Sequence, residues 1–342
     1  MKKCNVIGLD LAKNVIQVCK ISSDGELIYN KAVSPNKLRE LLVKEKSSIV
    51  ALEGCGSCHY WGRLAQQYGH DVRIISPKKV KAFLQGQKTD ANDALAIAIA
   101  SIQVGMVFSQ LKSEEQQVIQ TVEKTRKFLD KSVTALSNHI RAFMYEYGIT
   151  SPQGKKGLRE TVTLVASDED QRLPANLQAV LTLLWERYKI TLEQLTANEK
   201  IREALVKTIE PCRRLLDLES VGPVGAARLY ASLGDGKIFK KGRDASVYIG
   251  LTPKQHSSGG KVYMRGINKG GGDKELRAVL FQGAFSVIYK LPTQARTKKQ
   301  AWLINLVARV GVKRAAIALA NKTVRTAWAL LVSGEKYKAE LV

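Results

Sequence analysis

The chain has 342 residues, with 54 Lys and Arg against 31 Asp and Glu, and its formal net charge at pH 7 is +23. This length suggests two or three domains, and a hydrophobic content of 45% excludes wholesale disorder. No apolar run approaches the ~20 residues that cross a bilayer, and we expect neither a signal peptide nor a membrane partner. Five cysteines, an odd number, favour reduced thiols in a cytoplasmic protein over a disulfide framework.

The positive charge is concentrated toward the C-terminus. Residues 211–342 hold 24 Lys and Arg against 8 Asp and Glu, a net charge of +16, whereas residues 1–210 have a net charge of +7. A folded chain this basic is typical of proteins that bind a polyanion, and nucleic acid is the default partner. The alternative is a basic protein without such a partner.

Residues 1–108 alternate between strand and helix patterns. The expected strands are 4–10, 14–21, 26–33, 48–53 and 71–75, and the expected helices are 36–45, 59–68, 77–84 and 90–104. Three strands followed by alternating helices and strands predict a mixed α/β domain with an antiparallel hairpin and parallel additions. This order fits the RNase H-like fold, although a doubly wound fold could share it.

The middle region, residues 109–211, is predicted to be helical. Residues 113–148 and 176–209 carry apolar positions at the spacing of one helix face, and 150–175 between them contain Pro and Gly and predict a loop with a short helical piece. The two long helices predict either an antiparallel hairpin or an intermolecular coiled coil, and either could set the oligomeric state.

Residues 212–342 form a third region that begins with a glycine-containing turn. In the stretch 218–229, Gly222 and Gly225 lie between two short predicted helices, and Arg228 follows them. A Gly-x-x-Gly turn exposes backbone N–H groups at a helix start, which can hold a phosphate. We therefore expect a helix-hairpin-helix-like element that contacts the DNA backbone; the alternative is an ordinary corner between helices.

Four acidic residues stand out in the first region. Asp10 and Glu53 each end a predicted buried strand, and Asp90 and Asp93 stand three residues apart at a helix start, on one helix face. Mg²⁺ prefers hard oxygen ligands, and clustered carboxylates repel one another without a cation. The four acids therefore predict a site for one or two Mg²⁺ ions suited to phosphoryl transfer. Taken singly, Asp90 could be an N-cap and Asp10 a turn residue.

A second motif, Cys55-Gly56-Ser57-Cys58-His59, matches the pattern of c-type haem attachment. We reject a haem because no export signal is expected and the motif lies beside the predicted acidic site. We also reject zinc because a second cysteine pair is lacking. The motif is interpreted as structural.

The third region also contains a serine pair, Ser257 and Ser258, before Gly259-Gly260. A Gly-Gly turn leaves a neighbouring hydroxyl exposed, and basic residues surround or follow it. From chemistry alone, such a serine is equally well a nucleophile or a hydrogen-bond donor to phosphate. The basic residues that we expect to contact nucleic acid here are Lys261, Arg265, Lys269, Lys274 and Arg277.

Six stretches together resemble the DEDD transposases of the insertion-sequence-110 family, nearly from end to end. The stretches are GLDLAK (8–13), ALEGCGSCHYWGRL (51–64), KTDANDA (88–94), SNHIRAFMYEYGI (137–149), SVGPVGAARL (220–229) and YIGLTPKQHSSGGK (248–261). The HSSGGK form and the DANDA spacing are most similar to the subgroup of insertion sequence 1111.

The resemblance implies a RuvC-like domain over 1–108, a coiled-coil middle over 109–211 and a C-terminal transposase domain with a catalytic serine over 212–342. It places Asp10, Glu53, Asp90 and Asp93 at the D, E, D and D positions. It selects Ser258 as the nucleophile because the family's serine precedes glycine, with Ser257 as second choice.

For the function, the resemblance implies a Mg²⁺-dependent recombinase that a structured non-coding bridge or seeker RNA guides to donor and target DNA. Strand exchange would pass through a phosphoserine link and a Holliday-junction-like intermediate. A dimer of dimers is implied, with the acids of one subunit facing the serine of another. The alternatives are a RuvC-like junction resolvase that hydrolyses DNA and a non-catalytic nucleic-acid architectural protein.

Overall fold

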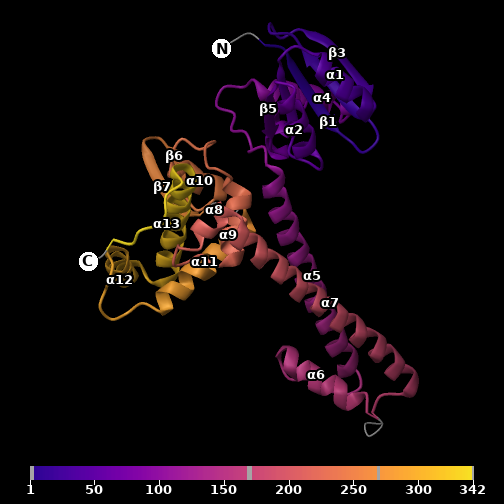
Figure 1. The fold of residues 1–342 in the computed structure, drawn as a ribbon, viewed down its shortest axis with the longest axis vertical. Helices are drawn as coiled ribbons and strands as arrows, with labels where there is room; N and C mark the ends of the chain where they lie inside the picture. Colours follow the sequence, from indigo (N-terminus) through magenta and orange to yellow (C-terminus); the bar gives the residue numbers. More distant parts are fainter. Residues whose placement is uncertain (1–3, 168–171, 268–269, 341–342) are drawn as a thin grey trace. The chain divides into compact units, whose positions relative to one another are not determined.

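The computed structural model describes residues 4–167, 172–267 and 270–340. The chain divides into two compact units, Met1–Glu115 and Gln116–Val342, which are described separately (Figure 1). In the part of the chain that the structure describes, no helix is both long and apolar enough to span a membrane.

The first unit is a mixed α/β domain. Its elements are, in chain order, β1 (Val6–Leu11), β2 (Ile16–Ile21), β3 (Leu27–Val33), α1 (Pro35–Lys44), β4 (Ile49–Glu53), α2 (Cys58–Gln67), β5 (Asp71–Ile75), α3 (Pro77–Val80), the 3₁₀ helix η1 (Lys81–Phe83) and α4 (Asp90–Ser101). The sheet has the order β3-β2-β1-β4-β5, in which β1, β2 and β3 are antiparallel neighbours and β4 and β5 extend β1 in parallel.

Successive residues of a strand point to opposite faces of the sheet, and here both faces carry apolar residues. Helices therefore cover both faces. One face packs against α1 and α2 through a cluster that includes Leu9, Leu52 and Trp61. The other face packs against α4 through small residues, among them Ala51 and Ala98. The result is a three-layer arrangement in which the carboxyl ends of β1 and β4 meet at one edge of the sheet.

The second unit is mainly helical. Its elements are α5 (Glu114–Tyr145), α6 (Gly154–Val165), α7 (Ala175–Thr208), α8 (Glu210–Leu215), α9 (Pro223–Leu233), α10 (Gly242–Ile249), β6 (Pro253–Ser258), β7 (Lys261–Ile267), α11 (Lys274–Tyr289), α12 (Lys298–Val310) and α13 (Val312–Ser333). The long helices α5 and α7 run side by side in Figure 1 and share one apolar cluster with α6.

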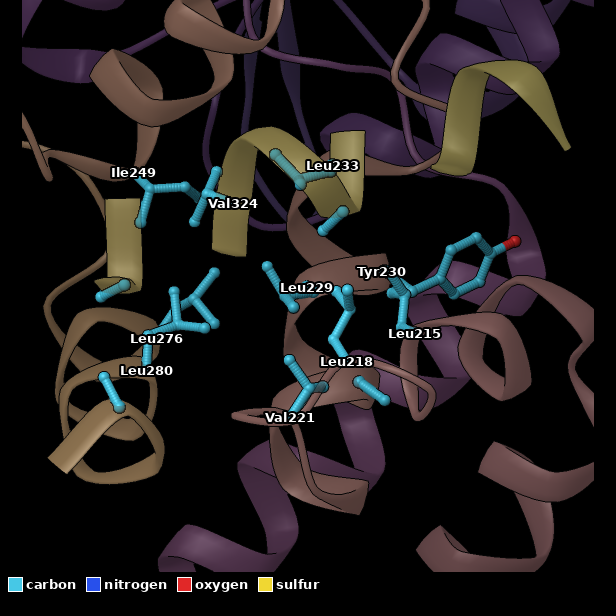
Figure 2. Packing of buried hydrophobic residues seen from close by; sticks show 14 of the residues in the cluster. Leu215, Leu218, Val221, Leu229, Tyr230, Leu233, Ile249, Leu276, Leu280 and Val324 are labelled. Carbon is cyan, nitrogen blue, oxygen red and sulfur yellow. The ribbon is translucent and has the colours of Figure 1, made fainter. Parts of the chain in front are cut away.

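Helices α8 to α13 enclose the largest apolar core of the chain. Figure 2 shows Leu229 and Leu233 of α9 beside Leu276 and Leu280 of α11, and Val324 of α13 completes the cluster. Each of these side chains is almost fully buried. At about 1.5–3 kcal/mol for each fully buried large aliphatic side chain, this core holds α8 to α13 together as one body.

The sequence-based prediction of an α/β first part and a mainly helical second part is confirmed. Two local predictions were wrong: the helix expected over 90–104 ends at Ser101, and the one expected over 77–84 is divided into α3 and η1. The short helical piece expected within 150–175 is the twelve-residue α6. Helix α6 forms because Leu158, Val162 and Val165 give it a buried stripe that packs on α5 and α7.

Candidate active site

Asp10 and Glu53 lie at the same edge of the sheet. They follow Leu9 and Leu52, which are partners in the parallel register of β1 and β4. Parallel strands end at the same edge, and the two carboxylates extend from neighbouring strands there. Both side chains are half-buried.

Helix α4 brings Asp93 toward this edge because Gly8 lets it approach β1 closely. A Cβ atom built on Gly8 would lie 2.4 Å from the Ala94 carbonyl oxygen and 2.8 Å from the Ala98 Cβ. Gly8 and Asp10 are two residues apart on one strand and therefore face the same side of the sheet, the side that α4 covers. In the sequence Gly8-Leu9-Asp10, the glycine therefore allows the close contact with α4, and the aspartate two residues later supplies a carboxylate to the site.

The start of α4 carries the other two acids. Thr89 caps the helix, its Oγ1 accepting a hydrogen bond from the Asn92 backbone N–H at 3.2 Å, and Asp90 and Asp93 occupy the first turn. Asp90 is exposed, whereas Asp93 is half-buried. Thr89, rather than Asp90, is therefore the N-cap, and both carboxylates remain available for other contacts.

Burial and nearby negative charge make Asp10 and Glu53 reluctant to ionise. Burial raises the pKa of Asp10 above its ordinary value of 3.8, with Asp93 and then Asp90 adding to the rise and Lys88 opposing it. Burial likewise raises the pKa of Glu53, and Asp10 and Asp93 add to it. The four side chains therefore share one electrostatic environment in which negative charge is in excess.

The donor chemistry of this set suits Mg²⁺, which prefers carboxylate oxygens, because a cation would offset the repulsion. Among the described residues, however, no three His, Cys, Asp or Glu side chains are gathered closely enough to hold an ion. Asp10 lies within electrostatic range of Asp90 and Asp93, and Glu53 lies within range of Asp10 and Asp93. Holding a Mg²⁺ ion would require these side chains to move closer together.

The loop after β4 contains Cys55 and Cys58, which are both free thiols. Burial, then the neighbouring Cys58 and Glu53, raise the pKa of Cys55 to about 11. His59 accepts a hydrogen bond at Nδ1 from the backbone N–H of Lys112 at 3.3 Å, so this ring takes part in packing the loop. The interpretation of this motif as structural agrees with these contacts.

The two serines lie on an exposed β-hairpin that the sequence analysis did not predict. Strand β6 pairs with β7, with Ser258 opposite Lys261 and Ser257 opposite Val262. Gly259 and Gly260 form the two-residue turn at φ values of 55° and 76°. Two residues with positive φ are typical of the hairpin turns whose twist matches the strands. A Gly-Gly pair between two alternating segments was the signal for this hairpin.

Ser257 and Ser258 face opposite sides of the hairpin because neighbouring strand residues alternate. Ser258 shares its face with His256, Lys261 and Tyr263. Ser257 shares its face with Gln255, whose Nε2 donates a hydrogen bond to the Ser257 Oγ at 2.8 Å. One face therefore combines a hydroxyl with an imidazole and an ammonium group, and on the other face the serine hydroxyl already has a partner.

The basic residues predicted to contact nucleic acid have different surroundings. Lys261, Arg265 and Lys274 are exposed, whereas Lys269 lies outside the described residues. Arg277 is buried and donates from Nη1 to the backbone carbonyl oxygens of Ile249, at 2.9 Å, and Gly271. The structure thus gives Arg277 the role of joining α11 to the loops around the hairpin.

Arg228 is also held inside the second unit. Its Nε donates to Glu123 and its Nη1 to Glu275, both at 3.0 Å. Glu123 is almost fully buried and lies within 4 Å of Arg126 and Arg202 as well. This cluster joins α5 and α7 to α9 and α11, and nothing in the sequence periodicity indicates it, because Glu123, Arg202, Arg228 and Glu275 are far apart along the chain.

The turn before α9 places its two glycines differently. Gly222 is exposed at the N-cap of α9, and Gly225 is buried within that helix against Val221. Ser220 lies under α13, with its Oγ 2.8 Å from the Oγ1 of Thr323. The surface of this turn is therefore limited to the exposed start of α9.

Comparisons with known proteins now place the chain. Residues 7–149 match the family model of the DEDD transposases of IS110 type, and residues 212–300 match that of the transposase IS116/IS110/IS902 family. The first match covers the acidic residues and the second covers the hairpin with its two serines.

Relatives extend this similarity over nearly the whole chain. The transposase of insertion sequence element IS1111A from Coxiella burnetii is 37% identical over 99% of this chain and 92% of its own length. The transposase of IS1328 from Yersinia enterocolitica is 33% identical over 98% of both chains. A pilin gene-inverting protein from Moraxella bovis is 23% identical over 86% of this chain and 89% of its own. The chain therefore belongs to the IS110 family of insertion-sequence transposases.

Proposed function

We propose that this transposase cuts and rejoins DNA through a covalent link between Ser258 and a DNA phosphate. In the proposed reaction, the Ser258 Oγ attacks phosphorus, a new O–P bond forms, and the bond from phosphorus to the 3′ oxygen breaks. The serine proton ends on the leaving 3′ oxygen, so the step consumes no other reagent. The phosphoester energy is conserved, and a second 3′ hydroxyl can reverse the attack to complete strand exchange.

The observation that carries this proposal is the placement of Ser258 on an exposed hairpin face with His256 and Lys261. A serine hydroxyl is a weak nucleophile until a base accepts its proton, and His256 is the group on that face with this capacity. The Lys261 ammonium adds positive charge for the phosphate. Ser257, on the opposite face, lacks this combination.

The acidic residues supply the second half of the proposed site. DEDD transposases typically use divalent metal ions, and we assign Mg²⁺ to Asp10, Glu53, Asp90 and Asp93. When bound, Mg²⁺ would offset the negative charge that develops on the phosphate and the leaving oxygen. The chain itself would bring the four carboxylates toward one sheet edge, with Asp10, Glu53 and Asp93 partly shielded from water and Asp90 exposed.

A hydrolytic resolvase remains the second candidate, because an RNase H-like domain with four acids also suits hydrolysis. The similarity to the pilin gene-inverting protein of Moraxella bovis favours strand exchange over hydrolysis, because inversion of a gene requires that the cut DNA ends be rejoined. Conservation of bond energy in a phosphoserine meets that requirement, and hydrolysis does not.

The remaining parts of the proposal follow the family resemblance. We assign a RuvC-like fold to residues 1–108, a coiled coil to 109–211 and the serine-bearing transposase domain to 212–342. A structured non-coding RNA would select donor and target DNA by base pairing, and the protein then needs mainly backbone contacts. The net charge of +16 on residues 211–342 and the exposed start of α9 at Gly222 support such contacts. A dimer of dimers would carry out the exchange.

The decisive experiment looks for the covalent link. Wild-type protein with guide RNA, labelled donor DNA and Mg²⁺ should give a protein-linked DNA band on a denaturing gel. Ser258→Ala should lose this band and strand cleavage while still binding DNA, and Ser257→Ala, the matched control on the opposite face, should retain both. Cleavage without a linked band in the wild type would favour the resolvase, and a band that survives in Ser258→Ala but not in Ser257→Ala would move the nucleophile to Ser257.

A further inference from the structure

A basic hollow lies on the second unit, apart from the serine hairpin and from the predicted nucleic-acid contacts. It has a volume of about 790 Å³, and the residues that define it are Lys241 and Arg243 at the start of α10, Trp302 of α12, and Lys322, Arg325 and Trp328 of α13. This volume lies within the range of roughly 300–1,000 Å³ that is typical of ligand sites in proteins.

The charge of the hollow is entirely positive. Lys241, Arg243, Lys322 and Arg325 are exposed, and the described residues that line the hollow include no carboxylate. None of these four cations forms an ion pair with an acid within the described ranges, unlike Arg214 or Lys299 elsewhere in the same unit. Four unpaired cations around one concavity repel one another, and a bound anion would relieve this repulsion.

Two indole rings form the apolar part of the walls and are held in place. The Trp328 Nε1 donates to the backbone carbonyl oxygen of Gly236 at 3.0 Å. The Lys322 Nζ lies 5.0 Å from the centroid of the Trp302 ring, which is a cation–π contact. Both rings are half-buried, so each keeps an accessible part. Cations beside aromatic surface are typical of sites that hold nucleic-acid strands.

The hollow is linked to the serine hairpin through α10. Lys241 and Arg243 lie at the start of this eight-residue helix, and its last residue is four positions before β6 begins at Pro253. An α-helix of eight residues is about 12 Å long. Asn321 on the wall strengthens the link, because its Nδ2 donates to the Leu251 carbonyl oxygen at 3.2 Å.

We propose that this hollow binds the phosphodiester backbone of an unpaired DNA segment next to the phosphate that the serine attacks. The four cations would contact the phosphates, and the indole rings would pack against the sugars or bases. DNA is favoured over RNA because the hollow is tied by α10 to the hairpin that carries the cleaving group. The inference rests on the proposed function for the identity of the strand.

The test uses the full wild-type chain in EDTA, so that binding is measured without cleavage. The probe is a fluorescein-labelled 12-nucleotide single-stranded DNA that contains 5-iododeoxyuridine. In the double variant Arg243→Gln/Arg325→Gln, we expect the Kd at 100 mM NaCl to rise about tenfold and the salt slope to fall by about 1.4, since each single-strand phosphate contact contributes about 0.7. The matched control, Lys313→Gln/Arg314→Gln, removes two exposed charges from the start of α13 outside the hollow and should keep the slope.

Photocrosslinking locates the strand. We expect ultraviolet light to join the wild-type protein to this DNA at a peptide that contains Trp302 or Trp328, and the adduct to be lost in Arg243→Gln/Arg325→Gln. Equal affinity and slope in both double variants, or crosslinks only elsewhere, would overturn the inference. Crosslinks at these peptides from the matching 5-iodouridine RNA but not from the DNA would overturn the assignment to DNA. Because no readout needs cleavage, failure of the serine mechanism would appear separately, as absence of the protein-linked band.

Discussion

Asp10 lies near the end of the central strand β1, on the side of the sheet that α4 covers. Its pKa is raised by burial and by Asp93 and Asp90, which means that the ionised site carries a repulsion that a cation can relieve. Mg²⁺ at about ten times its Kd should therefore stabilise the wild type by roughly 1.4 kcal/mol. Asp10→Asn should lose this Mg²⁺-induced rise in Tm, whereas Asp24→Asn, in the exposed turn between β2 and β3, should keep it. Differential scanning fluorimetry at pH 7.5 measures both.

The same pKa shifts give stability a pH dependence in metal-free buffer. A raised pKa means that the folded chain binds more protons than the unfolded chain between the ordinary value, 3.8 for Asp10 and 4.5 for Glu53, and the raised one. The contribution of these two groups to stability therefore increases as pH falls through that window. We expect Asp10→Asn to reduce this increase, as measured by urea unfolding between pH 4 and pH 7. An unchanged profile would contradict the assigned repulsion.

His256 shares a hairpin face with Ser258 and is the proposed proton acceptor. General base catalysis contributes typically 10²- to 10⁴-fold, so His256→Gln should slow formation of the protein-linked DNA by about this factor. Gln255→Ala, on the face of Ser257, is the control and should leave the rate within about threefold. A wild-type rate in His256→Gln would remove the imidazole from the mechanism.

At the scale of elements, the turn of the serine hairpin depends on Gly260. Its φ of 76° is costly for any residue with a Cβ atom, at roughly 1–2 kcal/mol. Gly260→Ala should therefore disturb the pairing of Ser258 with Lys261 and lower the yield of protein-linked DNA, with little change in global Tm because the hairpin is exposed. Gly266→Ala, on exposed β7 with open space around it, should have no such effect. Equal yields from both variants would show that the turn geometry is not needed.

The joint between the long helices and the C-terminal core depends on Glu123. This buried carboxylate lies 3.0 Å from the Arg228 Nε and 3.8 Å from the Arg202 Nη1. Glu123→Gln would remove the buried negative charge that Arg126, Arg202 and Arg228 share. We expect a loss of about 3–5 kcal/mol in the free energy of unfolding, although Arg228 keeps its pair with Glu275. Glu186→Gln, which breaks the exposed pair with Lys189 on α7, should cost less than about 1 kcal/mol. Chemical denaturation compares the two variants, and similar costs would contradict the role of the cluster.

At the scale of the whole molecule, the proposed dimer of dimers predicts complementation between defective subunits. If the acids of one subunit act with the serine of another, Asp10→Asn and Ser258→Ala proteins should each be inactive but should recover recombination when co-expressed. If each active site combines acids from one subunit with the serine of the other, one Asp10→Asn subunit and one Ser258→Ala subunit together form one intact site. If acids and serine come from the same subunit, every site in the mixture is defective. Co-expressed Asp10→Asn and Asp93→Asn proteins are the control and should stay inactive. If the Asp10→Asn and Ser258→Ala proteins co-purify but remain inactive together, the proposal that the acids and the serine of one site come from different subunits is contradicted.

Several features follow from the sequence alone because local patterns decide them. Alternating apolar residues predict β1 to β5, and the spacing of apolar residues predicts α5 and α7. Asp10 and Glu53 could be named as partners because the carboxyl ends of parallel strands meet at one edge. The motifs that surround them also sufficed to indicate the family.

Only the tertiary structure decided the rest, because the deciding contacts join residues that are distant along the chain. Arg228 and Arg277 are basic residues near a predicted DNA site, yet their partners, Glu123 and the Ile249 carbonyl oxygen, lie 105 and 28 positions away. A local sequence pattern cannot distinguish a basic residue that is buried and paired within the protein from one that is exposed and able to bind a phosphate. Ser257 and Ser258 likewise face opposite sides of the hairpin because β6 pairs with β7. The basic hollow exists only where α10, α12 and α13 meet. Charge and spacing indicate which chemistry a chain can perform, and packing determines which of its groups are free to perform it.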